Sequence, residues 1–193
     1  MSASRDREQA RLAAQHILSR KPVFLDTETT GIGPADELVE ICVLDHQGEV
    51  LVDSLVKPLC RVDPGARRHH GITDLMLEGA PLWPEVWPLV EAAVADRQMA
   101  VYNADFDVRM MRQSHKKHGI RWAFDEAGVA CIMHLYAQFY GEWDRRRGSY
   151  RWQKLESAAR QCGILLRNTH RARDDAVLSR AVLLHMAGKP SDR

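Results

Sequence analysis

The chain has 193 residues, of which 45 % are hydrophobic and 27 % charged, with 27 Lys and Arg against 26 Asp and Glu. These proportions are typical of a globular protein and exclude collagen-like, low-complexity and intrinsically disordered classes. The length suits one domain with a sizeable core, and no apolar run approaches the roughly 20 residues that a membrane-spanning helix needs.

The charge is distributed unevenly along the chain. Residues 1–100 carry 10 Lys and Arg against 16 Asp and Glu, whereas residues 101–193 carry 17 against 10. This asymmetry is compatible with nucleic-acid binding by the basic half, and equally with two solvated faces. The four cysteines form no C-x-x-C pair, so a zinc knuckle is not expected, and their number suits a reducing, cytoplasmic location.

Hydrophobic periodicity and turn signals predict the elements in chain order. An N-terminal helix precedes a buried strand at 22–26, and strands 38–44 and 50–56 form a hairpin, followed by a loop from 58 to 71. Helices and short strands then alternate, with helices at 83–94, 106–118, 135–140, 155–162 and 172–186 and strands at 99–102 and 128–132. This order indicates an α/β or α+β domain with a mixed sheet.

The expected organisation is one domain with short flanking segments. Residues 1–20 are an N-terminal helical extension, residues 21–187 a single domain, and residues 188–193 a tail. No repeat and no linker divides the chain.

Two carboxylates stand where the first predicted strand ends. Asp26 and Glu28 are separated by one residue, and alternate residues of a strand face the same side, so both side chains are expected to point together. Carboxylates that close repel each other unless a cation neutralises them, and such hard oxygen ligands suit Mg²⁺ or Mn²⁺. The alternative is a solvated surface pair, but the apolar strand before them and the glycine-containing turn after them favour a site.

Two further acidic segments stand where predicted helices begin. Asp105 and Asp107 follow the apolar strand 99–102, and Asp174 and Asp175 open the last helix shortly after His170. An acid at a helix N-terminus is commonly only a cap or dipole partner, which stabilises the helix by about 1 kcal/mol. The residues by themselves leave open which acid of each pair would face the first two carboxylates.

Three stretches form an ordered set of motifs: FLDTETTG at 24–31, NADFD at 103–107 and HRARDDA at 170–176, with HGIT at 70–73 between the first two. They resemble the three motifs of the DEDDh 3′–5′ exonucleases, the last in its histidine form H-x-A-x-x-D. This family includes the proofreading epsilon subunit of bacterial DNA polymerase III. The resemblance covers roughly residues 22–187, and Tyr102 departs from it, since many members have His there.

The resemblance implies a ribonuclease-H-like fold, a central mixed five-stranded sheet flanked by helices, and a role for each motif residue. His170 would be the general base. Two Mg²⁺ or Mn²⁺ ions would be held by four carboxylates, which selects one acid of each pair: Asp26, Glu28, Asp107 and Asp175. Substrate contacts are implied for four more residues: Thr29, Ile32, His70 and Asn103. For Ile32, a loop residue that covers the core is an equally good interpretation.

The function expected from this resemblance is metal-dependent removal of nucleoside 5′-monophosphates from the 3′ end of DNA by two-metal-ion hydrolysis. The same residues fit an exoribonuclease acting on RNA ends or short oligonucleotides, because discrimination against a 2′-hydroxyl depends on packing around the terminal sugar. A catalytically inactive nucleic-acid-binding module is the third hypothesis, although it is expected to lack a carboxylate and all four are present. Expected partners are single-stranded 3′ ends of DNA and, for a proofreading subunit, a DNA polymerase subunit; no membrane association is expected.

A basic run lies in the second half of the chain. Three arginines at 145–147 precede Tyr150, Arg151 and Trp152. Arginines neutralise phosphates and aromatic rings stack on bases, so this stretch is a candidate mobile flap over a single strand. The alternatives are a solvated charge run and, for Trp152, a place in the core.

Overall fold

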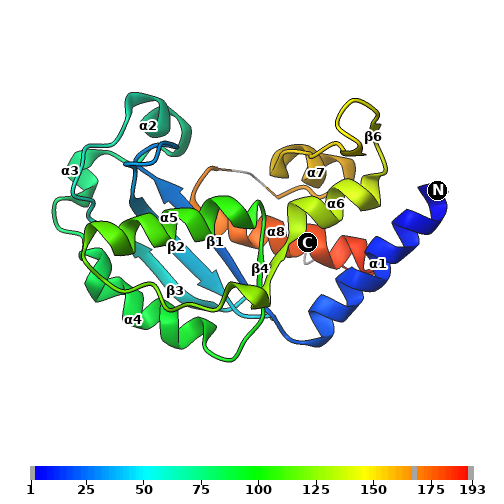
Figure 1. The fold of residues 1–193 in the computed structure, drawn as a ribbon, viewed down its shortest axis with the longest axis horizontal. Coiled ribbons are helices and arrows are strands. Elements are labelled where there is room, and N and C mark those ends of the chain that lie inside the picture. The colour runs from blue at the N-terminus through cyan, green and yellow to red at the C-terminus, as the bar shows by residue number, and fades with distance from the viewer. Residues whose placement is uncertain (1–2, 167–168, 191–193) are drawn as a thin grey trace.

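The centre of the computed structural model, which describes residues 3–166 and 169–190, is a mixed sheet of five strands in the order β3-β2-β1-β4-β5 (Figure 1). The strands are β1 Val23–Thr29, β2 Leu38–Leu44, β3 Val50–Leu55, β4 Met99–Val101 and β5 Val129–Cys131. Strand β2 runs antiparallel to both β1 and β3, whereas β4 runs parallel to β1 and β5 parallel to β4. The predicted mixed five-stranded sheet flanked by helices is confirmed.

Helices cover both faces of this sheet (Figure 1). One face is covered by α1 Ala3–Ser19, α6 Ile132–Tyr140, α7 Leu155–Gln161 and α8 Ala172–Met186, and the other by α4 Trp83–Val94 and α5 Ala104–Lys117. Alternate residues of β1 separate the two cores, since Phe24 packs on the α8 side and Leu25 on the α5 side. By the same alternation Asp26 and Glu28 face α8, and Thr27 faces α5.

The stretch predicted as a loop between 58 and 71 contains a helix, α2 Pro64–His70, and a second short helix, α3 Asp74–Leu77, follows it. The prediction was wrong here because proline and glycine disfavour the interior of a helix but are compatible with its two ends. Pro64 opens α2, where its missing N–H costs nothing, and Asp63 caps it by accepting a bond from the Gly65 N–H. Gly71 ends the helix with a φ of 75°, the left-handed conformation that suits glycine.

The remaining elements are small. A single 3₁₀ turn, η1 Glu126–Gly128, precedes β5, and a two-stranded hairpin, β6 Trp143–Asp144 and β7 Ser149–Tyr150, stands next to α6. Of the helices in the described part of the chain, none has both the length and the apolar character to cross a membrane.

Candidate active site

Three carboxylates meet where β1 ends. Asp26 and Glu28 extend from β1 towards α8, whose first turn carries Asp175. One carboxylate oxygen of each residue lies within 4.8 Å of the other two. All three line one pocket of about 780 Å³. The prediction that the side chains of Asp26 and Glu28 point together is confirmed by this geometry.

Asp107 approaches the same pocket from the other face of the sheet. It lies in the first turn of α5, is 3 % exposed, and accepts a 2.7 Å hydrogen bond from Thr27 Oγ1. This bond holds its carboxylate beside β1, outside the compact group of three. Asp105 is exposed and lines a different pocket, and Asp174 accepts a hydrogen bond from Thr169. Of each pair, the acid selected by the motifs is the one that lines the site.

The gathered acids shift one another's ionisation. Burial, and then the negative charges of Asp107, Asp175 and Glu28, raise the pKa of Asp26 well above its ordinary value. Burial raises the pKa of Glu28 to about 9, with contributions from Asp175 and Glu40. Burial also raises the pKa values of Asp107 and Asp175 to about 7. Each shift favours the neutral acid, so the protein opposes a full set of negative charges here.

The donor set of this cluster fits a hard divalent cation. The compact group offers carboxylate oxygens, the ligands that Mg²⁺ and Mn²⁺ prefer. Asp175 Oδ1 is buried and has no hydrogen-bond partner among the residues that the structure describes. Because a buried polar atom without a partner is costly, a cation beside Asp175 would both satisfy this oxygen and relieve the repulsion.

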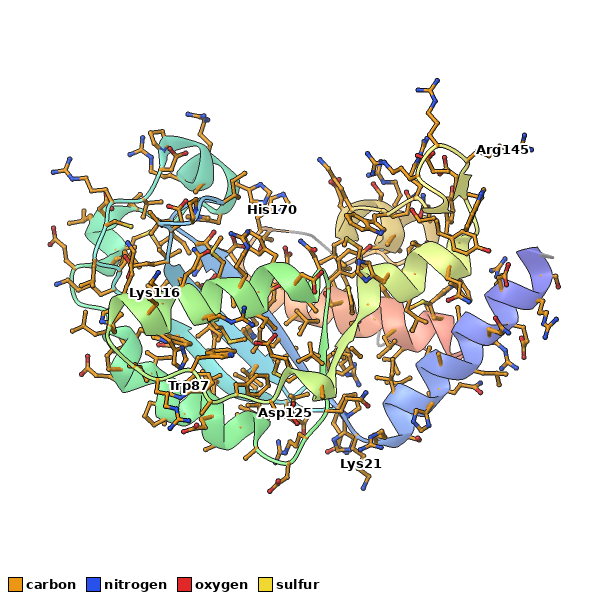
Figure 2. All side chains as sticks on the ribbon, viewed as in Figure 1. Lys21, Trp87, Lys116, Asp125, Arg145 and His170 are labelled. Carbon is orange, nitrogen blue, oxygen red and sulfur yellow. The ribbon has the colours of Figure 1, made fainter. Side chains whose placement is uncertain are left out.

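His170 lies next to the acids, between α2 and α7 (Figure 2). Its Nδ1 atom is 3.9 Å from Asp175 Oδ2, and its ring stacks on that of His69 with 3.8 Å between the centroids. His69 lines the pocket, and burial, followed by the neighbouring His170, lowers its pKa. Sequence reasoning missed His69 because it lies at the end of α2, in the stretch predicted as a loop.

The four residues predicted to contact substrate all line the pocket: Thr29, Ile32, His70 and Asn103. Ile32 is 81 % exposed, so it does not cover the core. His70 Nδ1 accepts the Ile72 N–H at 3.0 Å, which leaves Nε2 to donate to the Thr29 carbonyl at 3.1 Å. His70 therefore joins α2 to the end of β1 as a neutral imidazole.

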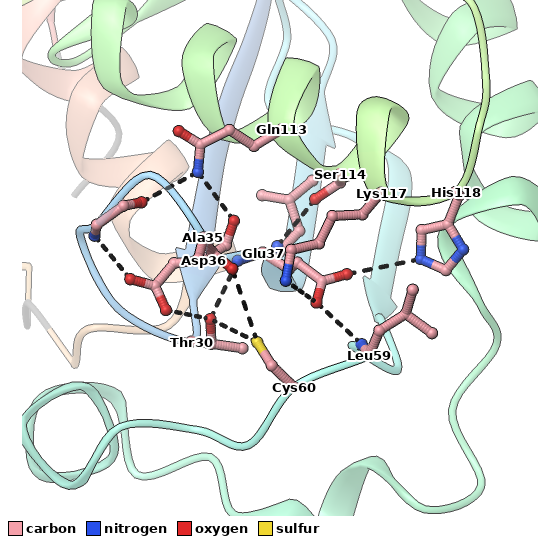
Figure 3. A network of polar contacts seen from close by, with 12 residues as sticks. Thr30, Ala35, Asp36, Glu37, Leu59, Cys60, Gln113, Ser114, Lys117 and His118 are labelled. Carbon is pink, nitrogen blue, oxygen red and sulfur yellow. Dashed lines mark hydrogen bonds and ion pairs between the residues drawn. The ribbon is translucent and has the colours of Figure 1, made fainter.

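Helix α5 holds the loop that carries Ile32 (Figure 3). Gln113 Nε2 donates to the carbonyl oxygens of Gly33 at 3.1 Å and Asp36 at 2.9 Å. The Asp36 carboxylate in turn accepts from Thr30 Oγ1 at 2.8 Å and from the Gly33 N–H at 2.6 Å. A Cβ atom at Gly31 would come within 2.7 Å of Asp36 Oδ2, so a side chain there would displace the Asp36 carboxylate from these contacts.

Buried Glu37 anchors the end of this loop. Its Oε1 accepts from Lys117 Nζ at 3.1 Å and from the Leu59 N–H at 3.0 Å, and Oε2 lies 3.6 Å from His118 Nε2 (Figure 3). Lys117 is the last residue of α5, the helix whose first turn holds Asp107. One rigid helix therefore positions both a carboxylate of the site and the loop at its rim.

A family model described as Exonuclease (RNase_T) matches residues 23–183. The chain belongs to this exonuclease family. The protein named uncharacterized exonuclease CP81 of Escherichia phage 186 is 37 % identical over 175 residues, which are 88 % of this chain and 90 % of that protein. The PolC-type DNA polymerase III of Thermotoga maritima is 30 % identical over 167 residues, which are 84 % of this exonuclease chain but 11 % of the polymerase.

Solved structures share the fold of this exonuclease. The nuclease domain of 3′hExo, a DEDDh family member, bound to rAMP has a TM-score of 0.67 at 17 % identity, covering 86 % of this chain and 91 % of that one. Exonuclease X in complex with 5′ overhanging duplex DNA has a TM-score of 0.61 at 20 % identity, and the match covers 88 % of this chain and 94 % of that one. The resemblance to the DEDDh exonucleases and the predicted ribonuclease-H-like fold are confirmed.

The raised pKa values predict how the stability of the metal-free protein depends on pH. Unfolded, these acids ionise near their ordinary pKa values of 3.8 and 4.5, whereas the folded values for Asp107, Asp175 and Glu28 are about 7 to 9. Their contribution to stability is therefore complete below pH 4 and is lost as the pH rises through 7 to 9. In EDTA, the Tm should fall between pH 6 and pH 8.5, and Mg²⁺ should raise it most at pH 8.5.

Asp26→Asn tests this electrostatic origin. Removal of one charge should raise the Tm in EDTA at pH 8.5, by about 2–4 °C for each kcal/mol of repulsion relieved, and should weaken the stabilisation by Mg²⁺. Glu49→Gln, which changes an exposed acid outside the pocket and away from any helix N-terminus, is the control and should change neither value. A lower Tm for Asp26→Asn in EDTA at pH 8.5 would contradict the prediction.

Proposed function

We propose that this exonuclease hydrolyses the 3′-terminal phosphodiester of DNA and releases nucleoside 5′-monophosphates. The proposal rests on one observation, the convergence of three carboxylates within 4.8 Å beside the His170 imidazole. Hydrolysis of a phosphodiester requires positive charge next to the phosphoryl oxygens and a base for the attacking water. The site offers ligands for the first and an imidazole for the second.

The proposed metal ligands are the four motif carboxylates: Asp26, Glu28, Asp107 and Asp175. When bound, two divalent ions would lower the pKa of a water molecule and stabilise charge on the departing 3′-oxygen. The chain contributes the placement of the ligands. β1 presents two of them on one face, and the first turns of α5 and α8 bring the other two.

His170 is proposed as the general base that takes a proton from the attacking water. The Nδ1 atom of its ring lies 3.9 Å from Asp175 Oδ2 and one ring face stacks on His69, so the imidazole is held beside the proposed metal ligands. An imidazole suits this role because it changes charge near neutral pH. The terminal nucleotide would meet the exposed side chain of Ile32, the backbone at Thr29, and the side chains of His70 and Asn103.

DNA is the favoured substrate class because relatives include DNA polymerase III proteins. Besides the PolC-type enzyme, the epsilon subunit of Pasteurella multocida is 32 % identical over 107 residues, which are 50 % of this chain and 42 % of that subunit. A DNA polymerase subunit is a proposed partner on the same ground. RNA is the second candidate, because the fold neighbour with the TM-score of 0.67 is described as bound to rAMP.

The first experiment compares two single strands of matched sequence, one DNA and one RNA, labelled at the 5′ end, with Mg²⁺ and then with Mn²⁺. We expect a ladder that shortens from the 3′ end, faster for DNA, and its loss in Asp26→Ala. Faster loss of the RNA strand would select the exoribonuclease. A folded wild-type protein that cuts neither strand but shifts both in a gel would select the binding module.

His170→Ala tests the proposed base. We expect kcat to fall by about 100- to 10,000-fold, the usual contribution of a general base. Mg²⁺ binding, measured by calorimetry, should change little because the four carboxylates remain. A variant with wild-type kcat would remove His170 from the mechanism.

The two-stranded hairpin β6–β7, whose turn carries the three arginines at 145–147, adjoins the pocket. Tyr102 and Leu155 line the pocket, and the Tyr102 hydroxyl donates to the Gln153 carbonyl at 2.8 Å, so the segment after the hairpin forms part of its wall. Trp152 is 57 % exposed, and its ring centroid lies 5.2 Å from that of His134. The alternative that placed Trp152 in the core is therefore wrong. Figure 2 shows Arg145 at the outer end of the hairpin. We propose that the strand runs from the pocket along this surface.

The variant R145A/R146A/R147A tests this path. The association constant for a single strand falls with salt concentration on a log–log plot. Each phosphate contact that is lost should make this slope less steep by about 0.7. The KM for a 15-nucleotide strand should therefore rise several-fold in low salt. Hydrolysis of the 4-nitrophenyl ester of thymidine 5′-monophosphate, which has no upstream strand, should be unchanged.

The matched control removes three exposed arginines that do not line the pocket, R20A/R97A/R121A, and has the same effect on net charge. An equal rise in KM for both triple variants would mean that overall charge, and not this hairpin, attracts the strand.

A further inference from the structure

Glu40 is a buried charge in the middle of an otherwise apolar strand. It is 4 % exposed and lies in β2 directly opposite Glu28 of β1. Its carboxylate is not one of the three that converge within 4.8 Å. Because a buried carboxylate is stable only where other groups replace water, its partners show what it does.

Within the described part of the chain, the hydrogen-bond partners of the Glu40 carboxylate belong to the two residues that follow His170. Arg171 Nε lies 3.0 Å from both carboxylate oxygens of Glu40, and Arg171 Nη2 also donates to Oε1. The Ala172 N–H donates to Oε2 at 2.9 Å. Both oxygens are therefore engaged, by a planar guanidinium and by the first N–H of α8. This leaves Glu40 poorly suited to bind a cation itself.

His170 has a backbone conformation that needs support. Its φ is 54°, in the left-handed region that few residues other than glycine adopt. A residue remains in such a strained conformation only where contacts with the surrounding structure hold it there. The contacts of Glu40 fix the chain immediately after His170, and they do so at the start of the helix that carries Asp175.

We propose that Glu40, acting through Arg171, is a positioning residue that holds the His170 imidazole in place beside Asp175. The inference rests on the proposed role of His170 as the base. His69 supports the ring face by stacking, and Glu40 supports the backbone below it. Glu40 does not touch substrate, and its effect passes through the backbone of residues 170–172.

Glu40→Gln replaces one carboxylate oxygen with an amide that cannot accept from Arg171. We expect kcat to fall by about 10- to 100-fold, the scale of a displacement of about 1 Å of a catalytic group, with KM within about two-fold. The matched control is Asp53→Asn. Asp53 lies 3.8 Å from Arg173, so this control also removes a carboxylate–arginine pair of α8. The Asp53 charge acts on Arg171 as well, but Asp53 is not among the hydrogen-bond partners of Arg171 and Ala172 described above. It should change kcat by less than about two-fold.

A double-mutant cycle separates positioning from general damage. If Glu40 acts through His170, Glu40→Gln should cost less than about three-fold in kcat when His170 is already Ala, because the group that it positions is gone. Equal losses in both backgrounds would overturn the proposal. Arg171→Lys, which keeps the charge but cannot span both oxygens, replaces Glu40→Gln in the cycle if the latter does not fold.

A measurement on the metal-free protein keeps this inference separate from the proposed function. With ¹⁵N-labelled histidines, the ring proton signals of His69 and His170 report their stacking in NMR spectra. Glu40→Gln should shift both signals and Asp53→Asn neither. Unshifted signals in Glu40→Gln would overturn the positioning role. If His170→Ala keeps its kcat, the base assignment fails, and the NMR comparison still decides whether Glu40 holds the ring.

Discussion

The repulsion between carboxylates at the end of β1 is the constraint on which the rest of this structure depends. β1 is the central strand of the sheet, and its alternation places Asp26 and Glu28 on one face and Thr27 on the other. Helix α8 closes over the first face and α5 over the second, so acids from both helices converge on the same strand end. Burial, and then the neighbouring negative charges, raise the pKa values of Asp26 and Glu28, so both oppose ionisation of the gathered acids.

Several features of the fold reduce that cost. Asp107 and Asp175 lie in the first turns of α5 and α8, where the positive end of the helix dipole stabilises negative charge. Thr27 donates to Asp107, and Arg171 neutralises Glu40, which would otherwise add a further charge next to Glu28. These contacts are enough for the folded chain to gather the acids, but they leave Asp175 Oδ1 without a partner among the described residues.

Local patterns in the sequence predict the parts of the site that lie within one element. The i, i+2 spacing of Asp26 and Glu28 predicts their common face, and apolar periodicity predicts β2, α4 and α8 with their observed bounds. The choice of Asp107 over Asp105 required the family resemblance, because a helix start suits either acid. The stacking of His69 on His170 could not be predicted from the sequence, because it joins two segments 101 residues apart and one of them was predicted as a loop.

Glu40 shows what a sequence signal can and cannot give. A charge inside the apolar strand from 38 to 44 needs a buried partner, but the partner lies 131 residues further along the chain. The identity of Arg171 follows from α8 packing on β1 and β2, which is a tertiary contact. Arg171, the motif residue that follows the proposed base His170, is therefore explained by its contact with Glu40 of the sheet, and not by the chemistry of the motif itself.

Helix α5 links the chemistry of the site to the length of the proposed product. Its first turn carries Asp107, and Gln113 and Lys117, further along, hold the loop from Gly31 to Glu37. Because a helix is stiff over this length, the separation between the exposed Ile32 side chain and the carboxylates is set by the fold. A terminal base against Ile32, as proposed, would therefore lie at a constant distance from the carboxylates. A fixed separation of this kind would suit a product of one constant length, as in the proposed release of mononucleotides.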